Sequence, residues 1–146
     1  MRGSAAILSE GTLVRAGSNV PSELRYTDEH EWARLEGGEA VIGITDYAQK
    51  LLGDVVFLSL PNVGMHVTQS AKCGEIESPK AVSDIFTPLS GQVLAINEEA
   101  NAHPELVNRE PYGQGWLLRL ALDDASEWER LMTAEAYRAL VSAPDG

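Results

Sequence analysis

A strand–turn–strand pattern spans the stretch Gly74-Glu75-Ile76-Glu77-Ser78-Pro79-Lys80-Ala81-Val82-Ser83-Asp84-Ile85. Two short runs with apolar residues flank Ser78-Pro79-Lys80-Ala81 at its centre. Proline fixes its own φ, lacks a backbone donor and pushes the residue before it towards extended geometry, which suits the shoulder of a tight turn. The stretch therefore predicts a hairpin with Lys80 at its tip and the ammonium held away from the sheet.

Lys80 is one of only three lysines in a chain with eight arginines. A lysine near a turn is most often a solvated surface group with no further role. Here the composition prefers arginine wherever any positive charge will do, and lysine, unlike arginine, can lose its proton to give a nucleophilic amine. We therefore interpret Lys80 as an amine that can be acylated by an enzyme that reads the shape of the hairpin.

The composition is that of one globular domain with an acidic surface. At 146 residues, of which 44% are hydrophobic and 23% charged, the chain can bury a sizeable core. The formal net charge of −11 disfavours nucleic acid and anionic membranes as partners and favours proteins with basic rims around a cleft. The sequence has no apolar run of membrane-spanning length, and its single cysteine, Cys73, excludes an internal disulfide.

Short apolar or alternating runs, separated by turns with Gly and Pro, follow one another along most of the chain. This pattern predicts a mainly β fold, an antiparallel sandwich or flattened barrel. The almost continuous apolar run from Val55 to Leu60 predicts a strand buried on both faces. Strands are expected within residues 24–36, 40–44, 55–60, 65–71, 73–77, 81–86, 92–96 and 116–122.

Helical signals are few and short. A capping box that starts at Asp46 predicts a helix start, and Gly53 predicts its end. One further helical turn is expected at Pro104–Asn108, because proline is tolerated at a helix start. A second capping box at Ser126 and a cap at Thr133 predict a C-terminal helical hairpin.

The sequence contains no motif for independent catalysis. It has no glycine-rich phosphate loop, no Cys/His pair with metal-ligand spacing and no nucleophile elbow. The three histidines are scattered, and we interpret each as a surface or internally satisfied side chain. The sequence therefore predicts a protein that is not an enzyme and that binds no metal.

Several motifs in one order connect the chain to a known family. The stretches Glu77–Asp84 and Thr87–Gly91 resemble the lipoyl-attachment hairpin of the glycine cleavage system H proteins. Further stretches similar to that family are Tyr26–Trp32, Val41–Gln49, Leu52–Val56 and Pro111–Leu118. The resemblance implies a lipoyl-domain-like fold, a barrel-sandwich hybrid, over residues 22–141. Residues 1–21 are expected to be a flexible leader or a cloning remnant, and residues 142–146 a tail.

The resemblance also implies a function. Lipoic acid would be joined to Lys80 by an amide bond, and the chain would be a non-catalytic carrier of the glycine cleavage system. It would take an aminomethyl group from a pyridoxal-phosphate glycine decarboxylase to a tetrahydrofolate-dependent aminomethyltransferase, and dihydrolipoamide dehydrogenase would reoxidise its dithiol. Lipoate-attaching enzymes are the remaining implied partners. A monomer is expected, in the cytoplasm of a bacterium or the mitochondrial matrix of a eukaryote.

A cleft that shields the loaded arm from water is a further implication of the resemblance. The carboxylates of Glu31, Asp84 and Glu29 would hold the protonated amine there, although residue type alone would make them plain surface acids. Pro79 departs from the family, which usually has a β-branched residue before the lysine. Proline stiffens the tip and deletes one N–H that an attaching enzyme could use.

Other interpretations start from the same lysine. Within the family, a carrier can instead relay octanoyl or lipoyl groups to other enzymes. A biotinyl carrier uses a similar hairpin lysine, usually between methionines, whereas Pro79 and Ala81 flank Lys80 here. A protein-interaction module would leave Lys80 unmodified. The mass of the chain after incubation with lipoate ligase and ATP separates the last two from a lipoyl carrier.

Overall fold

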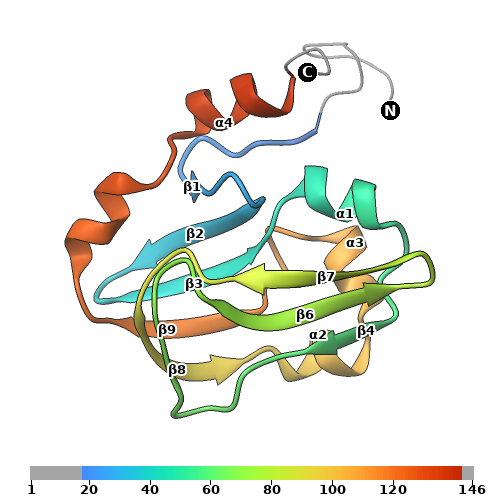
Figure 1. The fold of residues 1–146 in the computed structure, drawn as a ribbon, viewed down its shortest axis with the longest axis horizontal. Helices are drawn as coiled ribbons and strands as arrows, with labels where there is room; N and C mark the ends of the chain where they lie inside the picture. Colours follow the sequence, from blue (N-terminus) through green and yellow to red (C-terminus); the bar gives the residue numbers. More distant parts are fainter. Residues whose placement is uncertain (1–17, 143–146) are drawn as a thin grey trace.

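The chain folds into two antiparallel β-sheets with short helices around them (Figure 1). The computed structural model describes residues 18–142. Its strands are β1 (Arg25–Tyr26), β2 (Glu31–Glu36), β3 (Glu39–Ile44), β4 (Phe57–Ser59), β5 (His66–Val67), β6 (Lys72–Ser78), β7 (Ala81–Phe86), β8 (Gly91–Ile96) and β9 (Leu118–Leu122). Its helices are α1 (Asp46–Leu52), α2 (Glu98–Ala102), α3 (Glu105–Arg109), a 3₁₀ helix (Ala125–Arg130) and α4 (Ala134–Val141).

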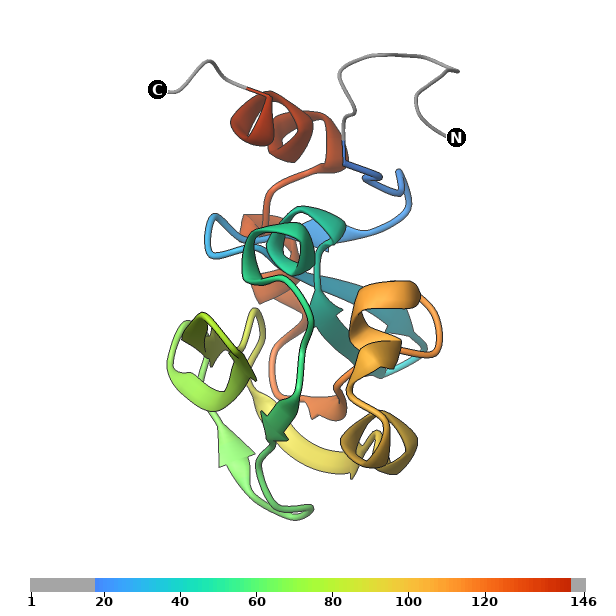
Figure 2. The same ribbon diagram turned by 90° about the vertical axis from the view of Figure 1, so that its right-hand side faces the viewer.

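Within residues 18–142, the larger sheet has six strands in the order β1-β2-β3-β9-β8-β5, and the smaller sheet has three in the order β4-β6-β7. Every neighbouring pair is antiparallel. The predicted mainly β, antiparallel fold is therefore confirmed. The β6–β7 hairpin and the helices α2 and α3 lie on opposite sides of the molecule (Figure 2).

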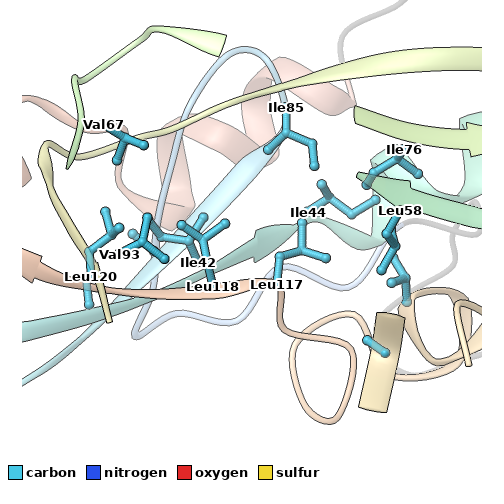
Figure 3. Close-up of a cluster of buried hydrophobic side chains, with 14 of the residues drawn as sticks. Ile42, Ile44, Leu58, Val67, Ile76, Ile85, Val93, Leu117, Leu118 and Leu120 are labelled. Carbon is cyan, nitrogen blue, oxygen red and sulfur yellow. The ribbon is translucent and has the colours of Figure 1, made fainter. Parts of the chain in front are cut away.

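The two sheets share one hydrophobic core, because alternate residues of their strands turn inward. Leu58, Ile76 and Ile85 from the smaller sheet belong to the same buried cluster as Ile42 and Leu118 from the larger one (Figure 3). Burying a side chain of this size stabilises the fold by roughly 1.5–3 kcal/mol. The hairpin is therefore anchored through its inner face, which leaves its tip available for other contacts.

The predicted hairpin is present, with a two-residue turn. Ser78 pairs with Ala81 across the turn, so Pro79 and Lys80 form its two central positions. Two-residue hairpins usually carry residues with a positive φ at these positions. Neither residue has a positive φ here. Proline at the first central position holds its own φ near −65° and so excludes the usual mirror-image turns. Pro79 therefore gives the chain a stiff tip of an uncommon type.

Strand β6 approaches β4 so closely that only glycine fits at position 74. A β-carbon on Gly74 would lie 2.4 Å from the carbonyl oxygen of Ser59. The pairing of β6 with β7 shifts register between Lys72 and Gly74, which places Cys73 at a β-bulge. The end of the hairpin that is far from the turn is therefore held by close backbone packing of β6 against β4.

Helix α1 is capped by Thr45 and not by the predicted Asp46. Thr45 Oγ1 accepts a hydrogen bond from the backbone N–H of Ala48 (3.2 Å), while Gln49 Nε2 donates to Asp46 Oδ1 (2.8 Å). Both residue types are good caps, but only Thr45 has the extended backbone that a cap needs, because β3 ends just before it. The predicted end is confirmed, since Gly53 follows the last residue of α1 with a φ of +81°.

The expectation that residues 55–60 form a strand buried on both faces is wrong. Only β4 forms there, at an edge of the smaller sheet, and within it only Leu58 is buried. Val56 and Phe57 are 53% and 57% exposed. A short edge strand can turn apolar side chains outward, so a continuous apolar run does not by itself establish burial on both faces.

The C-terminal segment begins with a 3₁₀ helix in place of the predicted capping box at Ser126. Asp124, two residues earlier, is the cap: its Oδ1 accepts hydrogen bonds from the N–H (2.9 Å) and the hydroxyl (2.7 Å) of Ser126. The cap at Thr133 is confirmed, because its Oγ1 accepts from the N–H of Ala136 (3.2 Å). The helical turn expected at Pro104–Asn108 is confirmed as helix α3, and helix α2 precedes it as an element that the sequence analysis did not expect.

Residues 18–21, which the sequence analysis assigns to the leader, pack against the domain. Val20 is buried in the cluster that holds Tyr137, and its carbonyl oxygen accepts a hydrogen bond from Arg138 Nη2 (2.7 Å). The N–H of Asn19 donates to Asp46 Oδ2 (3.0 Å). The rest of the expected leader, and residues 143–146 of the tail, lie outside the described residues.

Candidate functional site

Lys80 stands exposed at the tip of the β6–β7 hairpin. Its ammonium makes no hydrogen bond or ion pair with any residue between 18 and 142. The other two lysines differ: Lys50 pairs with Asp46 (3.3 Å), and Lys72 pairs with Asp84 (3.2 Å). Lys80 is thus the lysine whose amine is accessible without breaking a contact.

The stem of Lys80 lies beside the end of helix α1. A β-carbon built on Gly53 would be 3.7 Å from Lys80 Cε, which is an ordinary van der Waals distance. The far end of the stem therefore lies beside the end of α1, the helix that also forms one wall of a neighbouring groove.

A groove of about 300 Å³ begins next to the turn. Its walls are strand β7, helix α1 and the segment 29–31 that leads into β2. Ala81, the first residue of β7, lines it, so the groove opens one residue from Lys80. The lining comprises Glu29, His30, Glu31, Ile44, Ala48, Leu51, Leu52, Ile76 and Ala81–Asp84. The three acids that the sequence analysis singles out, Glu29, Glu31 and Asp84, all belong to this lining.

Glu31 is the buried acid of the groove, with only 2% of its surface exposed. Its Oε1 accepts a hydrogen bond from the hydroxyl of Thr27 (2.6 Å) and its Oε2 one from the N–H of Phe86 (3.0 Å). Burial nevertheless raises the pKa of the Glu31 carboxyl to about 7, because these two bonds offset only part of the desolvation. A cation in the groove would favour the ionised carboxylate and lower this pKa.

Glu29 and Asp84 are both exposed and come from different walls. Lys72 pairs with Asp84 and, more closely, with Glu75 (2.6 Å), so part of the Asp84 charge is neutralised. Among the described residues the carboxylate of Glu29 has no hydrogen bond or ion pair. Glu29 and Glu31 also border a second hollow of about 220 Å³ on the side of Phe86.

Sequence reasoning missed His30, Tyr137 and Thr45, whose side chains contact one another beside the groove. His30 lines the groove in a left-handed conformation with a φ of +73°. Its Nδ1 is 2.8 Å from the hydroxyl of Tyr137, which in turn is 2.7 Å from Thr45 Oγ1. The position of His30 between two candidate acids was the one available signal, and nothing in the sequence links it to a tyrosine 107 residues later.

Other reactive groups give no sign of a second chemical site in the described part of the chain. Burial raises the pKa of the Cys73 thiol to about 12, so it stays protonated at neutral pH and is a poor nucleophile. Residues 18–142 contain no group of three or more His, Cys, Asp or Glu side chains that could hold a metal ion. No helix in this range combines the length and apolar character needed to cross a membrane.

Comparison with known protein families shows to which family the chain belongs. The family model described as glycine cleavage H-protein matches residues 24–143. The chain belongs to this family. The resemblance that the sequence motifs indicated is thereby confirmed.

Individual H proteins match over nearly their whole length. The glycine cleavage system H protein of Aeromonas hydrophila is 55% identical over 125 residues, which are 85% of this chain and 97% of that protein. The H protein of Geobacillus kaustophilus is 51% identical over 124 residues, 85% of this chain and 98% of the relative. The crystal structure of the H protein from Mycobacterium marinum, at 37% identity, has a TM-score of 0.76 over 84% of this chain and 98% of that one.

Proposed function

We propose that this member of the H-protein family is a carrier that bears lipoate on the amine of Lys80 through an amide bond. The main support is that Lys80, alone of the three lysines, is exposed at a two-residue turn and has no ion pair with a described residue. An attaching enzyme must take a proton from Nζ and reach the nitrogen. Lys50 and Lys72 would first have to leave their carboxylate partners.

The surroundings of Lys80 fit a long apolar arm. Acylation removes the ammonium charge, so the modified side chain gains by covering apolar surface. The adjacent groove offers Leu51, Leu52 and Ile76 as walls, and Leu51 is 56% exposed. An arm that leaves Lys80 and lies in this groove would cover Leu51 and remove it from water.

Lipoate, when attached, supplies a dithiolane that can accept an aminomethyl group, which the chain's own side chains cannot do. We assign to this carrier the partners of the glycine cleavage system: the decarboxylase with pyridoxal phosphate, the tetrahydrofolate-dependent aminomethyltransferase and dihydrolipoamide dehydrogenase. The chain contributes position and environment and no catalytic group. Its net charge of −11 favours docking on partners with basic rims.

The groove residues hold the amine-bearing end of the arm and keep water from it. Apolar walls exclude water, which would hydrolyse the carried group. The carboxylates of Glu31, Asp84 and Glu29 attract a protonated amine. Glu31 contributes most, because a charge interaction with a buried carboxylate is screened least by solvent.

Incubation with lipoate, ATP and a lipoate ligase tests the attachment. The wild-type chain is expected to gain the mass of one lipoyl group, located on Lys80 by peptide mapping. Lys80→Arg should gain none, and the matched variant Lys72→Arg should gain as much as the wild type. A wild type that gains no mass, while a control lipoyl domain does, would refute the proposal and favour an interaction module. A gain with biotin ligase and biotin in place of lipoate would favour a biotinyl carrier.

The role of the groove has a separate test. Glu31→Ala should leave attachment at Lys80 intact and shorten the time for which the aminomethyl group is retained. Glu98→Ala is the matched control, because Glu98 is an exposed acid at the start of α2, on the opposite side of the molecule (Figure 2). Equal hydrolysis rates in the two variants would contradict the proposed shielding.

A further inference from the structure

His30 lines the groove and is bound through its side chain to the C-terminal helix. Its Nδ1 lies 2.8 Å from the hydroxyl of Tyr137 in α4, and its ring lies 4.8 Å from that of Tyr47 in α1. The Tyr137 hydroxyl is also 2.7 Å from the hydroxyl oxygen of Thr45, the cap of α1. Three polar groups from three parts of the chain therefore meet behind the groove.

Counting protons fixes the direction of these hydrogen bonds. Thr45 and Tyr137 are 0% exposed, so bulk water does not serve either hydroxyl. Thr45 Oγ1 already accepts from the N–H of Ala48, and among the described residues the acceptor within reach of its own proton is the Tyr137 oxygen. Tyr137 can then donate to His30 Nδ1, and both buried hydroxyl protons have an acceptor. The reverse direction would leave the buried Thr45 proton without an acceptor, which is unfavourable.

An imidazole that accepts at Nδ1 is neutral and carries its proton on Nε2. The carboxylates of Asp28 and Glu29, beside His30 in its own turn, act in the opposite direction and favour an imidazolium. We propose that Tyr137 and Thr45 hold His30 as the neutral Nε2–H tautomer and so reserve the negative charge of the groove for a cationic amine. The identity of that amine rests on the proposed function, whereas the tautomer does not.

The other groups around His30 agree with this assignment. Burial lowers the pKa of His30, and this outweighs the opposing effect of Glu29 and Asp28. The neighbours from the packed helices, Tyr47 of α1 and Tyr137 of α4, are aromatic, and burial raises the pKa of Tyr137 so that it stays protonated. A positive charge on this wall would instead pair with Glu29 and repel an incoming amine.

Nitrogen-15 NMR of the histidine rings in the full chain tests the tautomer directly. Wild-type His30 should show a protonated Nε2 and an unprotonated Nδ1, and should titrate below the ordinary midpoint of a histidine. Tyr137→Phe removes one hydroxyl and should release the tautomer and raise the midpoint by about 0.5–1 pH unit. Tyr26→Phe is the matched control, because Tyr26 is equally buried and stacks on Tyr137 at 4.6 Å, but donates its hydroxyl to the carbonyl of Pro21.

The charge part of the proposal is tested with methylammonium as a probe of the groove. At pH 6.5 it should bind several-fold more weakly to Tyr137→Phe than to Tyr26→Phe. Equal binding to the two variants, or no binding to the wild type, would refute the claim that the groove keeps its negative charge for a cationic amine. Protonation of Nδ1 in wild-type His30 would refute the assigned tautomer. Identical titration of His30 in Tyr137→Phe and Tyr26→Phe would refute it as well. If Tyr137→Phe does not fold, the wild-type spectrum decides alone. None of these measurements uses lipoate, so a failure of attachment at Lys80 is a separate result.

Discussion

The buried carboxyl of Glu31 makes the stability of the fold depend on pH in an uncommon direction. Its pKa is about 7 in the folded chain, against 4.5 for an unperturbed glutamate. Between these values the folded chain keeps a proton that the unfolded chain has released, so the free energy of unfolding falls as the pH rises. A pKa difference of one unit corresponds to about 1.4 kcal/mol. The free energy of unfolding above pH 7 is therefore lower by about 3 kcal/mol than below pH 4.5.

Comparison with Glu31→Gln isolates this contribution, because every other acid titrates in both proteins. The amide cannot accept from both Thr27 and Phe86, which adds a cost that does not vary with pH. The unfolding free energy of the wild type minus that of the variant should fall by about 3 kcal/mol from pH 4.5 to pH 8 and then stay level. Urea unfolding at a series of pH values measures this difference.

Two outcomes would refute the reasoning. A difference that stays constant over this range would mean that the two hydrogen bonds fully compensate the burial of Glu31. A difference that rises with pH would mean that the folded pKa lies below the ordinary value. Thr27→Val provides an internal check: it removes a hydrogen bond that lowers the pKa, so the fall with pH should become larger and extend to higher pH.

Three further substitutions test the fold and the turn. Gly74→Ala should destabilise the chain by about 1–3 kcal/mol in urea unfolding, because its β-carbon would meet the carbonyl of Ser59 at 2.4 Å. Ile85→Ala should cost about 2–5 kcal/mol by opening a cavity between the sheets, and a cost under ~1 kcal/mol would contradict their shared core. Pro79→Ala should lower stability by about 0.4–1 kcal/mol, since the unfolded chain gains freedom. Lipoate attachment to Lys80 should persist in this variant, and its loss would show that the ligase requires the stiff turn.

The parts of the fold that sequence reasoning found are those with local causes. The hairpin followed from the fixed φ of Pro79, and the end of α1 followed from Gly53, because each residue acts on its own few neighbours. The predicted cap of α1 was wrong by one residue, because a neighbouring strand and not the residue type decides its position. Thr45 and Asp46 are both favourable caps by residue type, and the end of β3 decides between them.

The groove could not be predicted from the residues alone, because its walls come from distant parts of the chain. Residues 29–31, helix α1 and strand β7 meet only after both sheets have formed. The family resemblance supplied the acids Glu29, Glu31 and Asp84, but not the burial that raises the pKa of Glu31 or the contact of His30 with Tyr137. Those properties depend on the closed fold.

A carrier of this kind meets two conflicting requirements. In the proposed function the Lys80 amine must be exposed to several enzymes, whereas the cargo must be kept from water. The hairpin is compatible with both requirements, because Lys80 is at its tip and β7 is a wall of the groove. A cation in that groove stabilises the ionised form of Glu31. Below about pH 7 the cation must displace a proton from Glu31, so retention of the cargo should weaken over the range in which the empty fold becomes more stable. This opposite dependence on pH follows from one carboxyl that serves both the core and the groove.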